Sequence, residues 1–161
     1  MSQFQRSVKI IIDLEGGARL VTDSGGLTKW GISQRAYPNL DIASLTRVEA
    51  EQIYFRDYWL PVKGVDLPHP LGLFVFDAAV NQGVGRAIKM LQKAVNSMSS
   101  ANLVVDGDFG PRTMTAVSSI HPRELAVNFM TQRVFHYKNL THFTTYGRGW
   151  LNRLFRVSLR A

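Results

Sequence analysis

The sequence contains no cysteine among its 161 residues. Disulfide frameworks, thiolate zinc sites and cysteine nucleophiles are therefore excluded, and the fold can persist in either redox compartment. Acidic residues are few, with 12 Asp and Glu against 19 Lys and Arg, which gives a net charge of +7. This balance favours a polyanionic partner such as nucleic acid, an acidic membrane surface or an anionic cell-wall polymer. Because the arginines are scattered and no recognition motif is present, we expect no specific nucleic-acid partner.

Long hydrophobic runs are also missing. No apolar run approaches the roughly 20 residues that a membrane span requires. Near the N-terminus the run IIIDL is interrupted by Asp13, which makes it a poor signal-peptide core. We therefore expect a protein made in a cytoplasm, whose export needs outside help. With 45% apolar residues, a chain of this length is long enough for one buried core, so residues 1–161 are expected to form one domain.

The first part of the chain predicts a helix, a hairpin and a second helix. An apolar face with helical spacing runs from Phe4 to Ile12, and Gly16-Gly17 is the residue type that stops helices. The turn sequence DSGG lies between the β-capable pieces RLVT and LTKWGI, which predicts a small β-hairpin. Thr46 with Glu49 forms a capping box, and this pattern predicts a helix over 47–59.

The rest of the chain is expected to be helical. The segment PLGLFVFDAAVNQG is apolar almost all round, which predicts a buried central helix. Further helices are indicated by an apolar stripe from Val84 to Val95 and by Pro111 and Pro122 at helix starts. The last segment, residues 148–160, is expected to be an amphipathic helix. One side would carry Arg148, Arg153, Arg156 and Arg160, and the other side would carry Trp150, Leu151, Leu154 and Phe155. The predicted fold class is mainly α with a small β-hairpin near the N-terminus.

Glu15 stands at the predicted end of the first helix. The negative end of the helix dipole and the neighbouring apolar residues both disfavour a carboxylate there, so we expect the pKa of Glu15 to be raised towards the range of a general acid. A hairpin that follows directly can fold back so that Asp23 and Thr28 face Glu15. A protonated carboxyl on one side of a bond, with a carboxylate and a hydroxyl on the other, is the arrangement that glycosidic hydrolysis requires. A surface glutamate, a turn aspartate and a strand threonine are the structural alternatives.

Several ordered motifs resemble the family-108 glycoside hydrolases, which are N-acetylmuramidases found among phage endolysins. The matching motifs of the first part are EGG, DSGGLTKWGIS, YFRDYWLP and FDAAVNQG. The later pieces AIKMLQKAVN, VDGDFGPRTMTAV and GWLNRL are similar to the predicted peptidoglycan-binding region that accompanies this catalytic part. The resemblance runs from about residue 7 to residue 155 and implies a catalytic part over 1–95 and a C-terminal helical part over 96–161.

The resemblance implies a lysozyme-like helical fold that cleaves the β-1,4 bond between N-acetylmuramic acid and N-acetylglucosamine. Glu15 takes the position of the catalytic glutamate. Phage lysozymes more broadly have eight and five residues between their Glu, Asp and Thr, whereas seven and four separate Glu15, Asp23 and Thr28 here. This shortening is compatible with a shorter hairpin or with catalysis that depends on Glu15 alone, and it leaves the stereochemical course open.

Three further residues are candidates for substrate binding. Tyr58 offers an aromatic face for a sugar ring, while Trp59 is expected to pack in the core. Asn81 and Gln82 end the apolar central helix, where they bind N-acetyl or hydroxyl groups of the glycan or simply cap the helix. Asp77, on the same helix, is expected to be a structural residue with a partner, because a buried carboxylate needs one.

No metal or other cofactor is expected. The loop DGDFGP invites a calcium interpretation, but the twelfth residue counted from Asp106 is Val117 rather than the glutamate that a calcium-binding loop needs. The four histidines show no paired metal-ligand spacing. Residues 148–160 are a candidate contact with an anionic membrane or lipopolysaccharide, although a docked helix with solvated arginines is the simpler interpretation.

The sequence therefore predicts a monomeric endolysin-type muramidase that binds and hydrolyses bacterial peptidoglycan and causes lysis. We expect synthesis in the bacterial host cytoplasm without a signal peptide, release through a holin-like pore, and action in the periplasm or cell wall. Two alternatives stay open: a non-enzymatic peptidoglycan-binding module, and a lytic transglycosylase, whose chemistry also uses one glutamate.

Overall fold

The first helix, α1 (Gln3–Leu14), includes the predicted apolar face and ends before the predicted glycines. The computed structural model describes residues 1–23 and 26–161; of Asp23 it describes only the backbone. At the start of α1, Ser2 and Gln5 form a capping box. Its buried face includes Val8, Ile11 and Ile12. Glu15 is the C-cap, and the Gly17 N–H donates to the Ile12 carbonyl over 2.9 Å, as in a Schellman motif.

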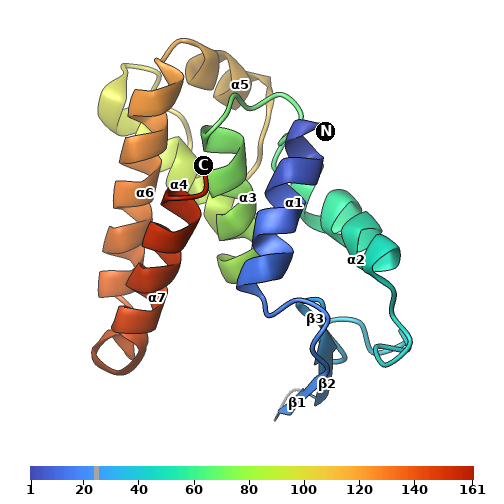
Figure 1. Ribbon diagram of the computed structural model, residues 1–161. Helices are drawn as coiled ribbons and strands as arrows, with labels where there is room; N and C mark the ends of the chain where they lie inside the picture. The colour runs from blue at the N-terminus through green and yellow to red at the C-terminus, as the bar shows by residue number, and fades with distance from the viewer. Residues whose placement is uncertain (24–25) are drawn as a thin grey trace. The chain divides into compact units, whose positions relative to one another are not determined.

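A three-stranded antiparallel sheet follows α1, with the order β1 (Val21–Asp23), β2 (Gly26–Lys29), β3 (Ile32–Ser33) (Figure 1). The predicted hairpin is thus confirmed and gains a short third strand. Thr28 is paired with Val21 on one side and with Ser33 on the other. The Ser24-Gly25 part of the predicted turn lies outside the described residues.

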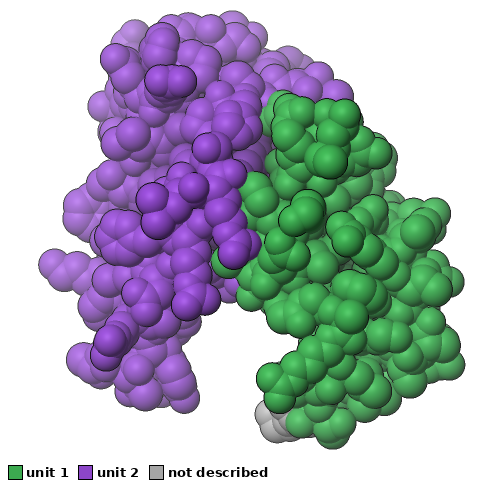
Figure 2. Space-filling model, in the orientation of Figure 1, with its two compact units in different colours: residues 1–57 green, residues 58–161 purple. Residues whose placement is uncertain are grey.

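The helix predicted over 47–59 consists of an α-helical part followed by a π-helical part. The segment α2 (Arg47–Tyr54) is α-helical and begins with the expected Thr46–Glu49 capping box. The next five residues, η1 (Phe55–Trp59), form a π-helical turn, which apolar periodicity does not distinguish from an α-helical one. Residues 1–57 and 58–161 form two compact units, coloured green and purple in Figure 2.

The second unit is a helical bundle. Its helices are α3 (Leu71–Gln82), α4 (Val84–Met98), α5 (Pro111–Ser118), α6 (Pro122–Lys138) and α7 (Phe143–Ser158). The helices α3, α4 and α6 pack on one another, and α7 packs against α6 (Figure 1). All residues from 71 to 79 on α3 are buried, which confirms the predicted central helix.

The loop DGDFGP forms a turn before α5, as expected. Gln92, buried on α4, organises it by donating to the Asp106 carboxylate over 2.8 Å and accepting from the Gly107 N–H over 3.0 Å. The Asp108 N–H and Gln92 hold the pKa of Asp106 below its usual value. Gln92 was not identified from the sequence, because it lies beside the apolar stripe from Val84 to Val95 and does not interrupt it.

The expected division of α7 into an arginine side and an apolar side is wrong for Arg153 and for Phe155. Arg153 does not share a solvated face with the other arginines, because its side chain is only 14% exposed and pairs with the buried Asp77. Leu154 and Val157 are buried as a docked helix requires, while Phe155 is 67% exposed. Residue 153 lies three positions after Trp150 and four before the buried Val157, so helical spacing brings it to the docked side of α7, where it pairs with Asp77. No helix in the described part of the chain is long and apolar enough to cross a membrane.

Candidate functional site

Glu15 is half-buried at the point where α1 ends and the chain turns towards the sheet. Its backbone N–H completes the helix by donating to the Ile11 carbonyl over 2.9 Å. The positive φ values of Gly16 (+94°) and Gly17 (+64°) then redirect the chain. The backbone position of the candidate acid is therefore set by the helix end itself.

The turn between β2 and β3 lies against Glu15. It has two central residues, Trp30 and Gly31, with φ of +55° and +78°, which is the signature of a type I′ turn. Glycine is favoured at such positions, but a tryptophan in the left-handed region costs about 1–2 kcal/mol.

Three hydrogen bonds hold Trp30 in this conformation. Its N–H donates to the Gly17 carbonyl over 3.0 Å, and its indole Nε1 donates to the Leu45 carbonyl over 3.0 Å. The Tyr54 hydroxyl donates to the Trp30 carbonyl, also over 3.0 Å. Backbone strain that the surroundings enforce in this way is typical of functional sites.

Gly31 packs directly on the Glu15 side chain. A Cβ built on Gly31 would lie 2.7 Å from Glu15 Cβ and 2.8 Å from Glu15 Cγ, and it would also overlap the Tyr54 hydroxyl. Only a residue without a side chain fits between these groups. The stem of Glu15 is therefore held against the turn, with the buried Tyr54 beside it. Sequence reasoning missed Trp30 and Gly31, and the WG pair after a β-capable run is the signal that points to them.

The other two members of the predicted catalytic set are only partly described. Thr28 is half-buried in the middle of β2, in the same compact unit as Glu15. The backbone of Asp23 is paired with Gly26 at the end of β1, and its side chain lies outside the described residues. The catalytic role of all three residues stays a prediction.

The three candidate binding residues belong to the second unit, residues 58–161. Tyr58 is half-buried in the π-helical turn. Trp59 is buried and packs edge-to-face on Phe76, with 5.2 Å between ring centroids, which confirms its expected core role. Asn81 and Gln82 end α3 before Gly83 and enter a polar network with α6 and α7.

The centre of this network is Asp77, which is fully buried. Its Oδ2 lies 2.8 Å from Nη1 of the equally buried Arg133. Its Oδ1 accepts from Nε of Arg153 over 3.1 Å. The expectation that Asp77 is a buried structural residue with a partner is confirmed, and the partners come from α6 and α7.

Arg133 and Tyr137 connect this ion pair to the two amides. Arg133 Nε donates to Gln82 Oε1 over 3.1 Å, and the Tyr137 hydroxyl donates to Asn81 Oδ1 over 2.6 Å. Burial raises the pKa of Tyr137, so its hydroxyl is protonated at neutral pH. Its ring stacks on Trp150 with 5.1 Å between centroids. The network thus ties the end of α3 to helices that lie more than 50 residues later in the chain.

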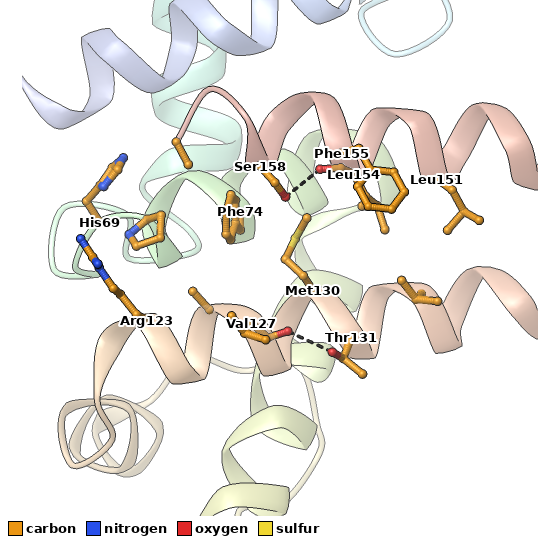
Figure 3. A pocket seen from close by; sticks show the side chains of 14 residues that line it. His69, Phe74, Arg123, Val127, Met130, Thr131, Leu151, Leu154, Phe155 and Ser158 are labelled. Atoms are coloured by element: carbon orange, nitrogen blue, oxygen red, sulfur yellow. Dashed lines mark hydrogen bonds between the residues drawn. The ribbon is translucent and has the colours of Figure 1, made fainter.

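An apolar cavity of about 590 Å³ lies between α6 and α7. Figure 3 shows Val127 and Met130 on one wall, Leu151 and Phe155 on the other, and His69 near Arg123 at one end. The hydroxyls of Thr131 and Ser158, which also line it, donate to carbonyls of their own helices. The walls therefore present mainly carbon to a ligand.

No group of three or more potential ligands among His, Asp and Glu could hold a metal ion in the part of the chain that the structure describes.

Two family models match the chain in consecutive segments. Residues 8–83 match glycosyl hydrolase 108, and residues 86–155 match a predicted peptidoglycan domain. The chain is also similar to the solved structure of Brucella abortus SagA, with 32% sequence identity and a TM-score of 0.83. The similarity covers 98% of this chain and 92% of the SagA chain. No curated protein matches the sequence.

Proposed function

Because the chain belongs to the glycosyl hydrolase 108 family, we propose that it is an N-acetylmuramidase with Glu15 as its catalytic acid. Its hydrolase and predicted peptidoglycan segments make it a glycoside hydrolase that acts on peptidoglycan. The bond that it hydrolyses in this proposal is the β-1,4 bond between N-acetylmuramic acid and N-acetylglucosamine. The observation that carries the proposal is the confinement of Glu15 by Gly31 and Tyr54 at the end of α1.

In the proposed reaction the Glu15 carboxyl gives its proton to the glycosidic oxygen while the bond between that oxygen and the anomeric carbon breaks. A water molecule supplies the hydroxyl that the anomeric carbon gains and gives its remaining proton to the carboxylate of Glu15 or Asp23, so that Glu15 is protonated again for the next turnover. Asp23 and Thr28 assist by stabilising positive charge on the sugar or by holding this water, which are the tasks of the second carboxylate in glycosidases. The confinement of Glu15 serves this step, because a misplacement of about 1 Å can cost about 100-fold in rate.

We further propose that Tyr58, Asn81 and Gln82 contact the glycan. An aromatic face with a polar edge suits a sugar ring, and the two amides suit its N-acetyl and hydroxyl groups. Residues 1–161 then act as one lysozyme-like domain rather than as an enzyme with a detachable module. Within residues 58–161, the pairing of Asp77, from the hydrolase segment, with Arg133 and Arg153, from the peptidoglycan segment, supports the absence of a domain boundary between the two segments.

The same proposal covers the biological setting, which is lysis by a phage endolysin. The exposed Arg148, Arg156 and Arg160 would approach an anionic membrane or lipopolysaccharide, with Phe155 and the apolar cavity beside them. Co-sedimentation with phosphatidylglycerol vesicles should exceed that with phosphatidylcholine vesicles and should fall in Phe155→Ser. Equal sedimentation of the protein with both vesicle types would remove this part of the proposal.

Product analysis tests the proposed reaction. Purified peptidoglycan is digested with the protein, and the released fragments are examined by mass spectrometry. We expect muropeptides with a reducing N-acetylmuramic acid end. An anhydro-muramic end would assign a lytic transglycosylase instead, and binding without any released fragment would assign a non-enzymatic module.

A further inference from the structure

Arg133 imposes a direction on the polar network at the end of α3. A guanidinium can donate hydrogen bonds but cannot accept them. Its Nε lies 3.1 Å from Gln82 Oε1, so the oxygen of that amide must face the arginine. Its Nη2 also approaches the Tyr137 hydroxyl oxygen at 3.5 Å. The positive charge beside this oxygen favours the hydroxyl hydrogen pointing the other way, towards Asn81.

Tyr137 in turn orients the second amide, that of Asn81. The hydroxyl lies 2.6 Å from Asn81 Oδ1, a short distance for a neutral hydrogen bond, and it supplies the hydrogen. Both amide oxygens at the end of α3 are therefore occupied by donors from α6. The NH₂ group of each amide faces away from its occupied oxygen.

The two NH₂ groups differ in their exposure to solvent. Asn81 is exposed, so its Nδ2 can reach a bound molecule directly. Gln82 Nε2 is buried and has no hydrogen-bond partner among the described residues. A buried donor without a partner costs about 1–3 kcal/mol, which a ligand or an ordered water can recover.

The charges of the network favour the same kind of ligand group. Asp77 carries one negative charge, whereas Arg133 and Arg153, which both pair with it, carry two positive charges. One positive charge is therefore left over beside the amides. Outward donors together with excess positive charge suit an oxygen that only accepts, such as that of a carbonyl or a carboxylate.

We propose that Arg133 and Tyr137 are positioning residues that orient the amides of Asn81 and Gln82, so that Asn81 donates to a carbonyl or carboxylate oxygen of peptidoglycan. The inference rests on the proposed function for the identity of the polymer. It also gives the predicted peptidoglycan segment a task, because two of its residues orient the last residues of the hydrolase segment.

The substitution Asn81→Asp tests the direction of these hydrogen bonds. Aspartate has the shape of asparagine and still accepts from Tyr137, but it replaces the outward NH₂ with an oxygen. Binding to purified insoluble peptidoglycan is measured by co-sedimentation in a Glu15→Gln background, with released fragments quantified in the same samples. We expect the apparent Kd to rise about 10-fold or more, as for loss of a hydrogen bond to a charged or strongly polar group. Asn139→Asp, which makes the same charge change at an exposed site of this unit, should leave it unchanged.

The substitution Tyr137→Phe tests the positioning role separately. The ring and its stacking on Trp150 are kept, but Asn81 loses the donor that orients it. In the protein with Glu15 intact, KM should rise several-fold with little change in kcat, and Tyr146→Phe, at an exposed tyrosine, should leave both constants unchanged. A parallel loss of kcat and thermal stability would indicate a merely structural role and overturn the assignment.

Two further results identify the ligand oxygen and distinguish a failure of this inference from a failure of the proposed function. If the Asn81→Asp defect disappears on de-N-acetylated peptidoglycan, the ligand oxygen is the N-acetyl carbonyl. If the defect persists there, the oxygen belongs to the peptide stem, as a carbonyl or a carboxylate. Asn81→Asp binding as tightly as the parent would overturn the inference. Absence of released muropeptides from the Glu15-containing protein would overturn the proposed function alone, since the binding comparison does not need turnover.

Discussion

Gly31→Ala is the substitution that most severely tests the packing around Glu15. The new Cβ would lie 2.7 Å from Glu15 Cβ, whereas carbon atoms in contact prefer about 3.5–4.0 Å. Either the turn or Glu15 must therefore move by about 1 Å. Overpacking of this kind costs about 1–3 kcal/mol, and an alanine at the Gly31 φ of +78° adds about 1–2 kcal/mol. We expect the free energy of unfolding to fall by about 2–5 kcal/mol.

Gly17→Ala is the matched control. Its φ of +64° imposes a similar backbone cost, but nothing in the described residues lies within 4 Å of the added Cβ. Urea denaturation followed by circular dichroism gives both stability changes, and release of reducing ends from peptidoglycan gives the rates. For folded Gly31→Ala we expect a rate about 100-fold lower, as a 1 Å displacement of the acid predicts. Equal losses in the two variants would refute the claim that Gly31 confines Glu15.

Three other predictions concern the second unit. Asp77→Ala leaves the buried Arg133 without its carboxylate and should lower the free energy of unfolding by about 3–5 kcal/mol, measured by urea denaturation. Asp77→Ala with unchanged stability would contradict a buried ion pair. A chain truncated after residue 85 loses the helices that cover α3, so it should show no cooperative thermal transition by circular dichroism; a sharp transition would show an independent hydrolase domain. Burial, together with Arg86, Lys93 and Arg133, lowers the pKa of His136, so protonation favours the unfolded chain and stability should fall as pH drops through about 6.5 towards the folded-state pKa. The urea midpoint should therefore be lower at pH 5.5 than at pH 7.5, and His136→Gln should flatten this difference; an unchanged slope in His136→Gln would assign the pH dependence to other groups.

Features of the fold that depend on local chemistry were predictable from the sequence. The capping box at Thr46, the glycines after α1 and the prolines that open α5 and α6 act through their immediate neighbours, so the elements begin and end near the expected residues. The π-helical turn over 55–59 was not predictable, because its apolar pattern also fits an α-helix. Its presence changes which side chains of YFRDYWLP face the core.

Features that depend on partners far away in the sequence were only partly predictable from the sequence. Asp77 was expected to be buried and paired, since an apolar helix must compensate a carboxylate, but nothing local identifies Arg133 as the partner. Arg153 was assigned to the wrong face because its charge was interpreted as a sign of solvent exposure, although its spacing from the buried Val157 places it on the docked side. At the candidate site, the position of Glu15 followed from the helix end. Its packing against Gly31 required the three-dimensional turn, because Trp30 violates the usual preference for glycine or asparagine there.

The central claim is that Glu15 donates the proton that breaks the glycosidic bond. Glu15→Gln keeps the size and packing of the side chain against Gly31 but cannot supply that proton. With urea denaturation showing a folded protein of unchanged stability, the release of reducing N-acetylmuramic acid ends from purified peptidoglycan should fall by at least about 100-fold, the lower range for loss of a general acid. Undiminished release by the folded variant would contradict the account.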